Sequence, residues 1–220
     1  MPVDEALAHV ARVEQSHDWR AAEELYRQMI HQAPQVVAAH LGLARCLQFQ
    51  ERLEESLLIN ERALQLDPKS VFAQANVANL LHQLGRLDDS LDRFTTVIAM
   101  SPQFAELFVS RGGVLRDMGR AAEAITDFRR AVQLKPDAAL YYSNYLYTLL
   151  YEHADDPEML FAEHRAFGER IEQQVEACRE HSNFPEPDRR LRIGYSSPNF
   201  RDHAVNFFVE PILASHDRRS

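Results

Sequence analysis

The sequence has few of the residues that build disulfides, metal sites and phosphate loops. Only two of the 220 residues are cysteine, Cys46 and Cys178, and their separation matches neither a metal-ligand spacing nor a disulfide framework. Only seven are glycine, and the pair Gly112-Gly113 falls inside a helical pattern. No apolar run approaches the roughly 20 residues that span a bilayer. These absences predict a cytoplasmic protein with no metal, no bound cofactor and no membrane contact.

Positive charge is also scarce. Lys and Arg number 24 against 33 Asp and Glu, a formal net charge of −9. Residues 185–220 hold six arginines and five acids, which leaves 18 basic and 28 acidic residues for residues 1–184, a net charge of −10 there. Because a duplex-binding protein needs the opposite sign, we expect no nucleic-acid partner. The amino terminus likewise has acids where a signal peptide needs cations.

The sequence does contain a period of 34 residues. A proline recurs at this spacing, each time at the end of a helical pattern, at Pro34, Pro68, Pro102 and Pro136. A helix-breaking residue at constant spacing indicates a repeated two-helix unit. The four units run over residues 3–36, 37–70, 71–104 and 105–138.

When the four units are aligned in this frame, similar residue types recur at the core positions of each unit. One column of the second helices has small or short side chains, where helices approach closely: Ala22, Ser56, Ser90 and Ala124. Four residues later a column of mostly larger side chains follows: Tyr26, Asn60, Phe94 and Phe128. The turn between the helices holds His17, Glu51, Gly85 and Gly119. A positive φ angle at this turn costs least for the glycines.

Two segments carry a family resemblance: LHQLGRLDDSLDRFTTVIAMSP (81–102) and LRDMGRAAEAITDFRRAVQLKP (115–136). They resemble the signature of the tetratricopeptide repeat family, and the resemblance covers residues 3–138. It implies an all-α fold in which helix pairs stack into a right-handed superhelix, because one unit cannot bury its apolar face alone. The first helices would line a concave surface that binds a peptide or a protein.

The expected lining of that surface comes from the second, fifth, sixth, ninth and twelfth places of each unit. The residues proposed for a peptide-binding groove are Arg45, Phe72, Asn76, Asn79, His82 and Arg116. Two arginines are too few to clamp a terminal carboxylate, because a desolvated carboxylate needs several converging cations. The amides of Asn76 and Asn79 either hydrogen-bond the backbone of an extended peptide or are merely solvated.

After residue 138 the pattern changes. Residues 139–151 still predict a first helix, and Pro157 is suited to begin a longer helix with an Asp cap before it. We expect residues 139–183 to cap the repeats and join them to a further domain. Pro185 and Pro187 make residues 184–188 a linker.

The remaining residues, 189–220, have the pattern that opens a parallel α/β domain. Apolar residues alternate over 191–195 as in a short strand, residues 196–199 are loop-like, and residues 204–213 have helical apolar spacing. In such domains functional groups gather at the carboxyl ends of the strands. We expect the start of a catalytic domain that is cut short at Ser220.

A second resemblance rests on LRIGYSSPNFRDHAVNFF (191–208) and SNYLYTLLYEHADDPEMLFAEHRAFGER (143–170). Both resemble the bacterial relatives of the O-linked N-acetylglucosamine transferases, a group that includes SPINDLY. The resemblance implies a tetratricopeptide solenoid that delivers proteins to a two-lobed, Rossmann-like GT-B glycosyltransferase. Only the first strand and helix of the first lobe would be present. The family uses no metal, and its co-substrate UDP-N-acetylglucosamine is held chiefly by the second lobe.

The same resemblance implies a catalytic role for His203. The histidine of this motif lies beside the donor sugar and the acceptor hydroxyl, and an imidazole with a pKa near neutrality can accept the hydroxyl proton. Asn199 and Arg201, in the same loop, would shape the substrate pocket. Without the resemblance, capping the next helix or bonding the loop is the simpler role for this histidine.

The sequence therefore predicts the substrate-recruiting part of an inverting protein O-glycosyltransferase, which moves N-acetylglucosamine from UDP-N-acetylglucosamine to Ser or Thr. These 220 residues alone are expected to be inactive, because the main donor-binding lobe is missing. Two alternatives remain: a free-standing tetratricopeptide scaffold, and a transferase that uses another donor such as GDP-fucose.

Overall fold

The computed structural model describes residues 3–174 and the isolated positions 209 and 215. The chain divides into two units, residues 1–175 and 176–220, and the fold described is that of the first. The described residues form ten helices and no strand, so the all-α prediction is confirmed for them. The expected linker (184–188) and the expected strand and helix (191–213) lie outside the described range.

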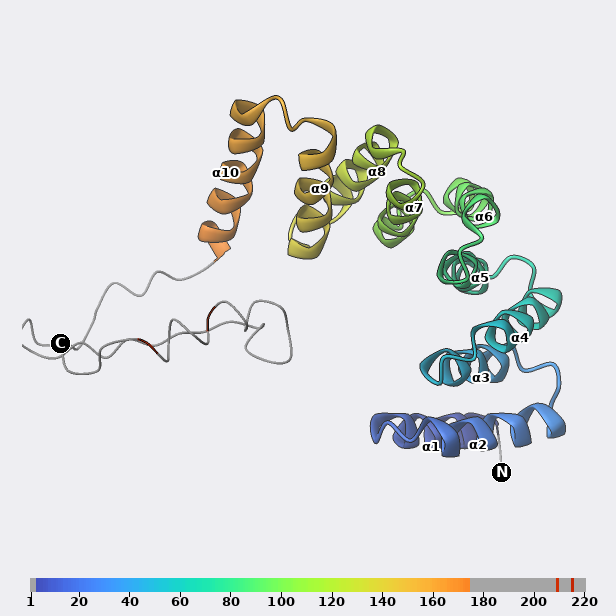
Figure 1. The fold of residues 1–220 in the computed structure, drawn as a ribbon. Helices are drawn as coiled ribbons and strands as arrows, with labels where there is room; N and C mark the ends of the chain where they lie inside the picture. The colour runs from blue at the N-terminus through green and yellow to red at the C-terminus, as the bar shows by residue number, and fades with distance from the viewer. Residues whose placement is uncertain (1–2, 175–208, 210–214, 216–220) are drawn as a thin grey trace, which may run out of the picture. The chain divides into compact units, whose positions relative to one another are not determined.

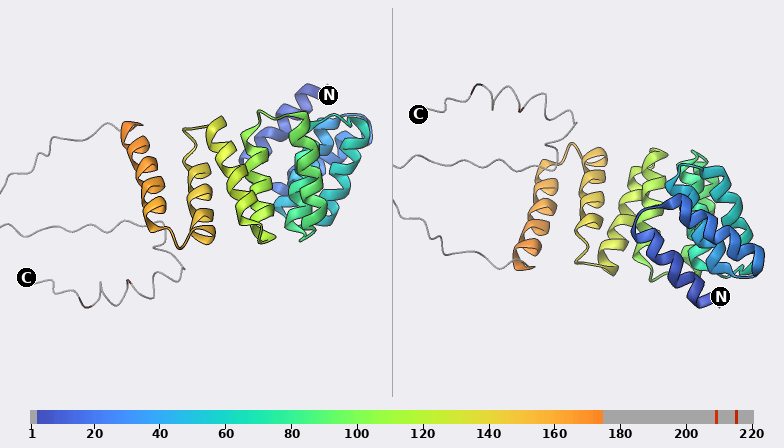
Figure 2. Two further views of the ribbon diagram at one scale, coloured as in Figure 1. Left: turned by 90° about the horizontal axis from the view of Figure 1, so that it is seen from above. Right: turned by 90° about the horizontal axis from the view of Figure 1, so that it is seen from below.

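The ten helices follow one another along a curved row, and each packs mainly against the helix before it and the helix after it (Figures 1 and 2). The first helices of the five pairs are α1 (Val3–Gln15), α3 (Val37–Phe49), α5 (Val71–Gln83), α7 (Ala105–Asp117) and α9 (Ala139–Glu152). The second helices are α2 (Trp19–Gln32), α4 (Leu53–Leu66), α6 (Leu87–Met100), α8 (Ala121–Leu134) and α10 (Pro157–Gln174).

The helix ends follow from local chemistry. Each of the four periodic prolines stands two residues after the last residue of α2, α4, α6 or α8, where it cannot interrupt the helix. Within the pairs, the turn has a positive φ at Gly85 (74°) and Gly119 (75°). His17 (60°) and Glu51 (61°) adopt the same conformation without that freedom. The predicted cap before α10 is also present: the backbone N–H of Met159 donates to Asp156 Oδ1 at 2.9 Å.

The small-residue column sits where the two helices of a pair cross. Its four members, Ala22, Ser56, Ser90 and Ala124, are all 0% exposed. The two serines also bond the partner helix, since Ser56 Oγ donates to the carbonyl of Ala44 and Ser90 Oγ donates to the carbonyl of Ala78, each at 2.7 Å. These bonds satisfy hydroxyls that would otherwise be buried without a partner.

Two glycines on the first helices make room for buried aromatic rings. A Cβ atom added to Gly112 would lie 2.8 Å from Cε1 of Phe128 on the paired helix α8. A Cβ atom added to Gly42 would lie 2.1 Å from Cζ of Tyr26, which comes from α2 of the preceding pair. Both contacts are far below a normal van der Waals distance. The glycines therefore set how closely neighbouring helices pack.

The carboxyl-terminal pair, α9 and α10, is joined by aromatic contacts. The rings of Tyr142 on α9 and Phe167 on α10 stack with their centroids 5.0 Å apart, and the guanidinium carbon of Arg170 lies 5.4 Å from the centroid of Tyr142. Helix α10 has 18 residues and is longer than the repeat helices, as expected. No helix in the described part of the chain is long and apolar enough to cross a membrane.

Candidate functional site

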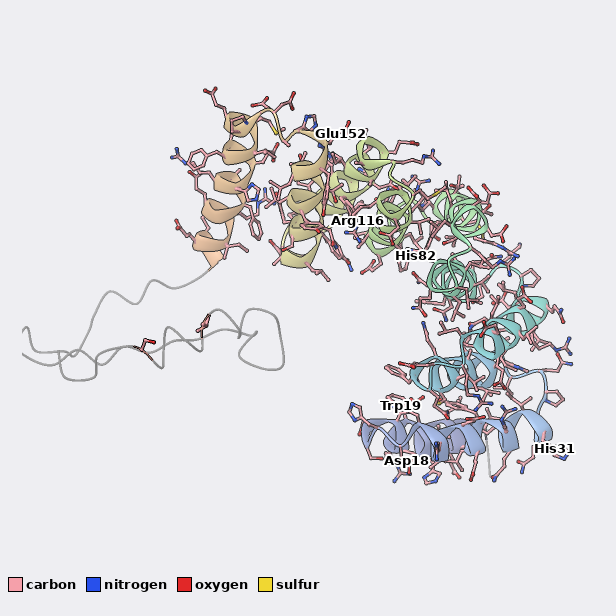
Figure 3. The ribbon with its side chains drawn as sticks, viewed as in Figure 1. Asp18, Trp19, His31, His82, Arg116 and Glu152 are labelled. Carbon is pink, nitrogen blue, oxygen red and sulfur yellow. The ribbon has the colours of Figure 1, made fainter. Side chains whose placement is uncertain are left out.

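One face of α5 carries most of the residues predicted to line a groove. Phe72, Asn76, Asn79 and His82 follow one another at spacings of three or four residues, which places them along one side of the helix. Phe72 is 68% exposed, and the other three are exposed or half-buried. Figure 3 shows His82 on the side toward which the helices curve, together with Arg116 of α7. This face is therefore accessible to a ligand.

Arg45, predicted to be a groove cation, is held in an ion pair. Its Nη2 atom lies 2.6 and 2.5 Å from the two carboxylate oxygens of Glu14 on α1. The hydroxyl of Tyr26 donates to the same carboxylate at 3.2 Å. Burial and the negative charge of Glu14 raise the pKa of Tyr26 to about 12, so this hydroxyl keeps its proton. Arg45 thus ties the first repeat to the second.

Polar side chains link neighbouring first helices at their carboxyl-terminal ends. Gln48 Nε2 donates to Gln83 Oε1 at 3.1 Å, and His82 Nε2 lies 2.7 Å from Asp117 Oδ2. Both pairs join the twelfth place of one repeat to the thirteenth place of the next, 35 residues later. Asp117 Oδ1 also lies 3.5 Å from Arg116 Nε. His82 and Arg116 therefore share one carboxylate.

The two predicted groove asparagines differ in their partners. Asn76 donates from Nδ2 to Oδ1 of the buried Asn60 on α4, at 3.4 Å. Asn60 itself donates to the carbonyl of Ser56 at 3.0 Å, so it is fixed within its helix. The side chain of Asn79 makes no hydrogen bond with any residue that the structure describes. Asn79 is therefore the better placed of the two to bond a peptide backbone.

Exposed tyrosines stand at the carboxyl-terminal end of the groove. Tyr147 and Tyr151, one turn apart on α9, are 51% and 64% exposed. Their rings meet edge to face with centroids 5.2 Å apart, and their hydroxyl oxygens are 2.5 Å apart. The guanidinium carbon of Arg116 lies 6.0 Å from the centroid of Tyr147. Glu152 completes a cavity of about 650 Å³ between the ends of α7 and α9.

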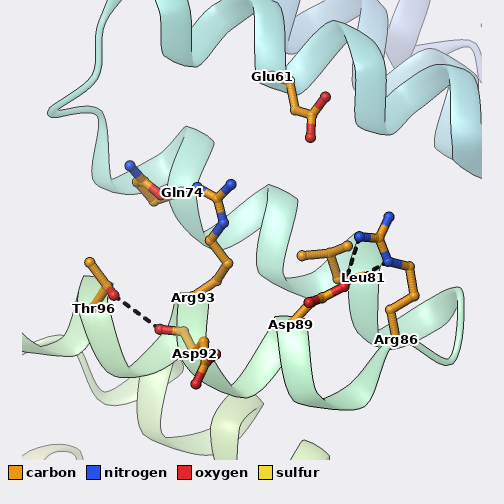
Figure 4. Close-up of a pocket in the computed structure, with 8 residues that line it drawn as sticks. All are labelled: Glu61, Gln74, Leu81, Arg86, Asp89, Asp92, Arg93 and Thr96. Carbon is orange, nitrogen blue, oxygen red and sulfur yellow. Dashed lines mark hydrogen bonds and ion pairs between the residues drawn. The ribbon is translucent and has the colours of Figure 1, made fainter.

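Two smaller cavities lie between successive second helices. The one between α4 and α6 has a volume of about 430 Å³ and is lined mainly by polar side chains (Figure 4). Arg86 there pairs with Asp89 at 2.7 Å, and Thr96 Oγ1 donates to the carbonyl of Asp92. A second, between α6 and α8, measures about 320 Å³. The cavity near Tyr147 is larger than either of these and has two exposed aromatic rings in its lining, so it is the stronger candidate site.

Three predicted site residues cannot be placed. His203, Asn199 and Arg201 lie outside the described residues, so the expected transferase pocket stays a prediction. Sequence reasoning also missed the tyrosine pair on α9. Tyr147 occupies the ninth place of the fifth unit, the place that Arg45 and Asn79 occupy in theirs. Extending the columns past residue 138 would have found it.

Neither a metal cluster nor an accessible cysteine is found among the described residues. No group of three or more His, Cys, Asp or Glu side chains within the described range is arranged to hold a metal ion. Cys46 is fully buried, and burial raises the pKa of its thiol to about 11. A thiol that stays protonated and shielded is a poor nucleophile, so this cysteine is a packing residue.

The fold and the groove define a helical-repeat solenoid. Family models described as tetratricopeptide repeat match residues 14–62 and 78–139. The chain belongs to the tetratricopeptide repeat family, whose stacked helix pairs form scaffolds for protein interaction. The expected family is therefore confirmed at this level.

Curated relatives match over part of the chain. The SPINDLY protein of Petunia hybrida is 33% identical over 82 residues, and that of Oryza sativa subsp. japonica is 34% identical over 82 residues. Both are described as probable UDP-N-acetylglucosamine–peptide N-acetylglucosaminyltransferases. Each match covers 37% of this chain and 9% of the relative. The chain thus matches a small fraction of these longer proteins.

Solved structures share the fold at low sequence identity. A MamA fragment from Desulfovibrio magneticus RS-1 has a TM-score of 0.69 and 14% identity, with 79% of this chain and 97% of that one covered. YrrB, described as a TPR protein with an unusual peptide-binding site, has a TM-score of 0.57 and 16% identity over 72% of this chain and 80% of its own. These similarities establish the solenoid architecture.

Proposed function

We propose that the concave groove binds segments of partner proteins in an extended conformation. The observation that carries this proposal is the accessible face of α5, where an exposed Phe72 is followed by the polar groups of Asn79 and His82. An extended segment presents backbone amides and carbonyls, which Asn79 can bond, and side chains that an exposed ring can cover. The described helices leave this face uncovered.

A photo-crosslinking experiment tests the groove. A benzophenone amino acid replaces Phe72 in one variant and Leu58, on α4, in a matched control, because the two side chains are 68% and 64% exposed. With a library of random 12-residue peptides, the groove variant is expected to crosslink peptides and the control to crosslink few. Equal crosslinking at both positions would show that the groove has no special affinity for peptides.

We further propose that the groove recruits proteins to a glycosyltransferase domain of a longer protein in the cytoplasm. The match to SPINDLY proteins supports this role. In the proposed reaction, a Ser or Thr hydroxyl oxygen bonds the anomeric carbon of N-acetylglucosamine, the bond from that carbon to the UDP oxygen breaks, and His203 accepts the hydroxyl proton. The groove itself takes no part in the chemistry and acts by raising the local concentration of the acceptor.

An activity assay separates this role from that of a free-standing scaffold. The complete gene product is incubated with radiolabelled UDP-N-acetylglucosamine or GDP-fucose and a cytoplasmic extract. We expect transfer from UDP-N-acetylglucosamine, lost in His203→Ala, and no transfer by the 220 residues alone. Transfer from GDP-fucose alone would show that the donor is GDP-fucose and not UDP-N-acetylglucosamine. Transfer from neither donor would favour a free-standing tetratricopeptide scaffold.

A further inference from the structure

The cavity between the ends of α7 and α9 combines aromatic faces with carboxylates. Its volume, about 650 Å³, falls within the range of roughly 300–1,000 Å³ that is usual for ligand pockets. Tyr147 and Tyr151 supply exposed rings, and Asp117 and Glu152 supply negative charge. Cations are recognised by such combinations, because the face of an aromatic ring and a carboxylate both attract positive charge.

The chain already places one cation against this aromatic pair. The guanidinium carbon of Arg116 lies 6.0 Å from the centroid of Tyr147, near the outer limit of a cation–π contact. Tyr151 meets Tyr147 at 79°, and the bond between the two hydroxyls holds the rings in that arrangement. Tyr151 is the more exposed ring, and no described cation is found within cation–π distance of it. It therefore remains available to a ligand.

The charges of the cavity favour a cationic ligand over an anionic one. Arg116 is its one cation, and Asp117 and Glu152 are its two anions, so the formal charge of the lining is −1. Asp117 is shared between His82 and Arg116. Glu152 forms no ion pair with any residue in the described range. An entering anion would meet this unpaired carboxylate, whereas an entering cation would neutralise it.

We propose that this cavity takes a lysine or arginine side chain of the protein segment bound in the groove. This inference rests on the proposed function and adds a specificity to it: the partner carries a basic residue where its chain passes α9. The long apolar stem of such a side chain covers the tyrosine rings, and its charged end reaches Glu152. The acidic balance of the chain, −9 overall, attracts the same class of partner.

Binding of defined peptide libraries tests the proposal on the whole 220-residue chain. Each library of 12-residue peptides is random except for a fixed central residue, which is Arg, Lys, Leu or Glu, and binding is followed by fluorescence anisotropy. We expect the Arg and Lys libraries to bind about five- to tenfold more tightly than the Leu library, and the Glu library to bind most weakly. The preference should shrink as salt is added, because partly exposed charges are screened.

Single substitutions test whether the preference for basic peptides comes from this cavity. Glu152→Gln removes the unpaired charge and should lower the affinity for the Arg library about three- to fivefold, with little change for the Leu library. Tyr151→Ala should lower the affinity for the Arg library, whereas Tyr151→Phe keeps the ring and should retain it. The matched control is Glu61→Gln, a carboxylate of the cavity between α4 and α6. Thermal unfolding verifies that every variant is folded.

The outcomes distinguish this inference from the proposed function. If no library binds, or if binding is unchanged in Phe72→Ala and Asn79→Ala, the groove is not a peptide site and both proposals fail. If peptides bind through the groove but the Arg, Lys and Leu libraries are equal, or Glu152→Gln behaves as Glu61→Gln does, only the cation site is overturned.

Discussion

The first two repeats and the next two share one frame but join their helices differently. In the first half, charged side chains bridge consecutive repeats: Arg45 pairs with Glu14, and Arg52 Nη1 lies 3.0 and 2.8 Å from the two carboxylate oxygens of Glu23. In the second half, the most buried arginine–carboxylate pair lies inside one repeat, where Arg111 contacts both oxygens of Asp127 at 2.7 and 2.8 Å. The third and fourth repeats are bridged instead by a histidine, since His82 Nε2 lies 2.7 Å from Asp117 Oδ2.

This difference shows that a place among the groove columns does not decide what a residue does. Arg45 is at the ninth place of its unit and Arg116 at the twelfth place of its own, and both columns are expected to line the groove. Arg45 is paired with a carboxylate that is 13% exposed, whereas Arg116 makes a longer contact of 3.5 Å with Asp117, lies 6.0 Å from the centroid of Tyr147 and lines the cavity. The groove cation at the amino-terminal end is therefore paired within the protein, whereas the one at the carboxyl-terminal end lines a cavity.

The largest expected difference is between two tyrosines. Tyr26 is 4% exposed, so Tyr26→Ala removes a buried ring and should lower the free energy of unfolding by about 3–5 kcal/mol. Tyr147 is 51% exposed, and Tyr147→Ala should change that free energy by less than about 0.5 kcal/mol. Urea denaturation measures both values. A large loss in Tyr147→Ala would mean that the carboxyl-terminal end of the groove is structural too.

The next largest effect on stability is expected at two glycines of the first helices, Gly42 and Gly113. Gly42→Ala places a Cβ atom 2.1 Å from the Tyr26 ring and should destabilise the protein by about 1–3 kcal/mol. In Gly113→Ala the nearest atom is His82 Cε1 at 3.8 Å, an ordinary contact. Because alanine favours helix, this control should stabilise the protein by about 0.5–1 kcal/mol. Thermal unfolding of both variants checks whether the signs are opposite.

The bridge at Glu23 predicts a dependence on pH. Burial raises the pKa of this carboxyl, but hydrogen bonds from Gln50, Arg27 and Arg52 outweigh burial and hold the pKa below its ordinary value of 4.5. The stabilisation it contributes is therefore complete above about pH 4.5 and is lost as the pH falls through the folded-state pKa. Glu23→Gln should cost about 1.5 kcal/mol at pH 7.

Unfolding of the wild type and Glu23→Gln from pH 7 to pH 3 tests this expectation. The difference between them should shrink below pH 4.5, where the wild-type carboxyl takes up a proton. Glu61→Gln is the control, because Glu61 takes part in no ion pair within the described residues. A difference that stays constant with pH would show that shape, and not charge, matters at position 23.

The fold could be predicted because it depends on local patterns that repeat. Pro34 and its three equivalents mark the helix ends, and the 0% exposed column from Ala22 to Ala124 marks where helices cross. Each of these residues acts within its own unit or on the next one. A pattern of period 34 therefore contains almost all the information that such a fold needs.

The candidate site could be predicted only in part, because it depends on pairing between units. The columns identified Arg45 and Arg116 as the two groove cations, and nothing local shows that Glu14, 31 residues before Arg45, pairs with Arg45. The tyrosine cavity depends on α9, where the repeat signature fades after residue 138. Phe72 and His82, by contrast, could be predicted as groove residues from the second and twelfth places of their repeat and the resemblance to tetratricopeptide repeats.

The smallest expected effect concerns the turns between paired helices, where the residue with positive φ is His17 or Glu51 in the first half and Gly85 or Gly119 in the second. Glu51 has a φ of 61° and Gly85 a φ of 74°, so the same backbone is strained in one and free in the other. Gly85→Ala should lose about 1 kcal/mol of stability, and because nothing lies within 4 Å of the added Cβ atom, the loss comes from the backbone alone. Glu51→Gly should gain about 0.5 kcal/mol, since the relief of strain exceeds the entropy that glycine loses on folding. Thermal unfolding of the two single variants and of the double variant measures these changes in stability. If Glu51→Gly also lowers the stability, contacts of the Glu51 side chain compensate for its strained backbone.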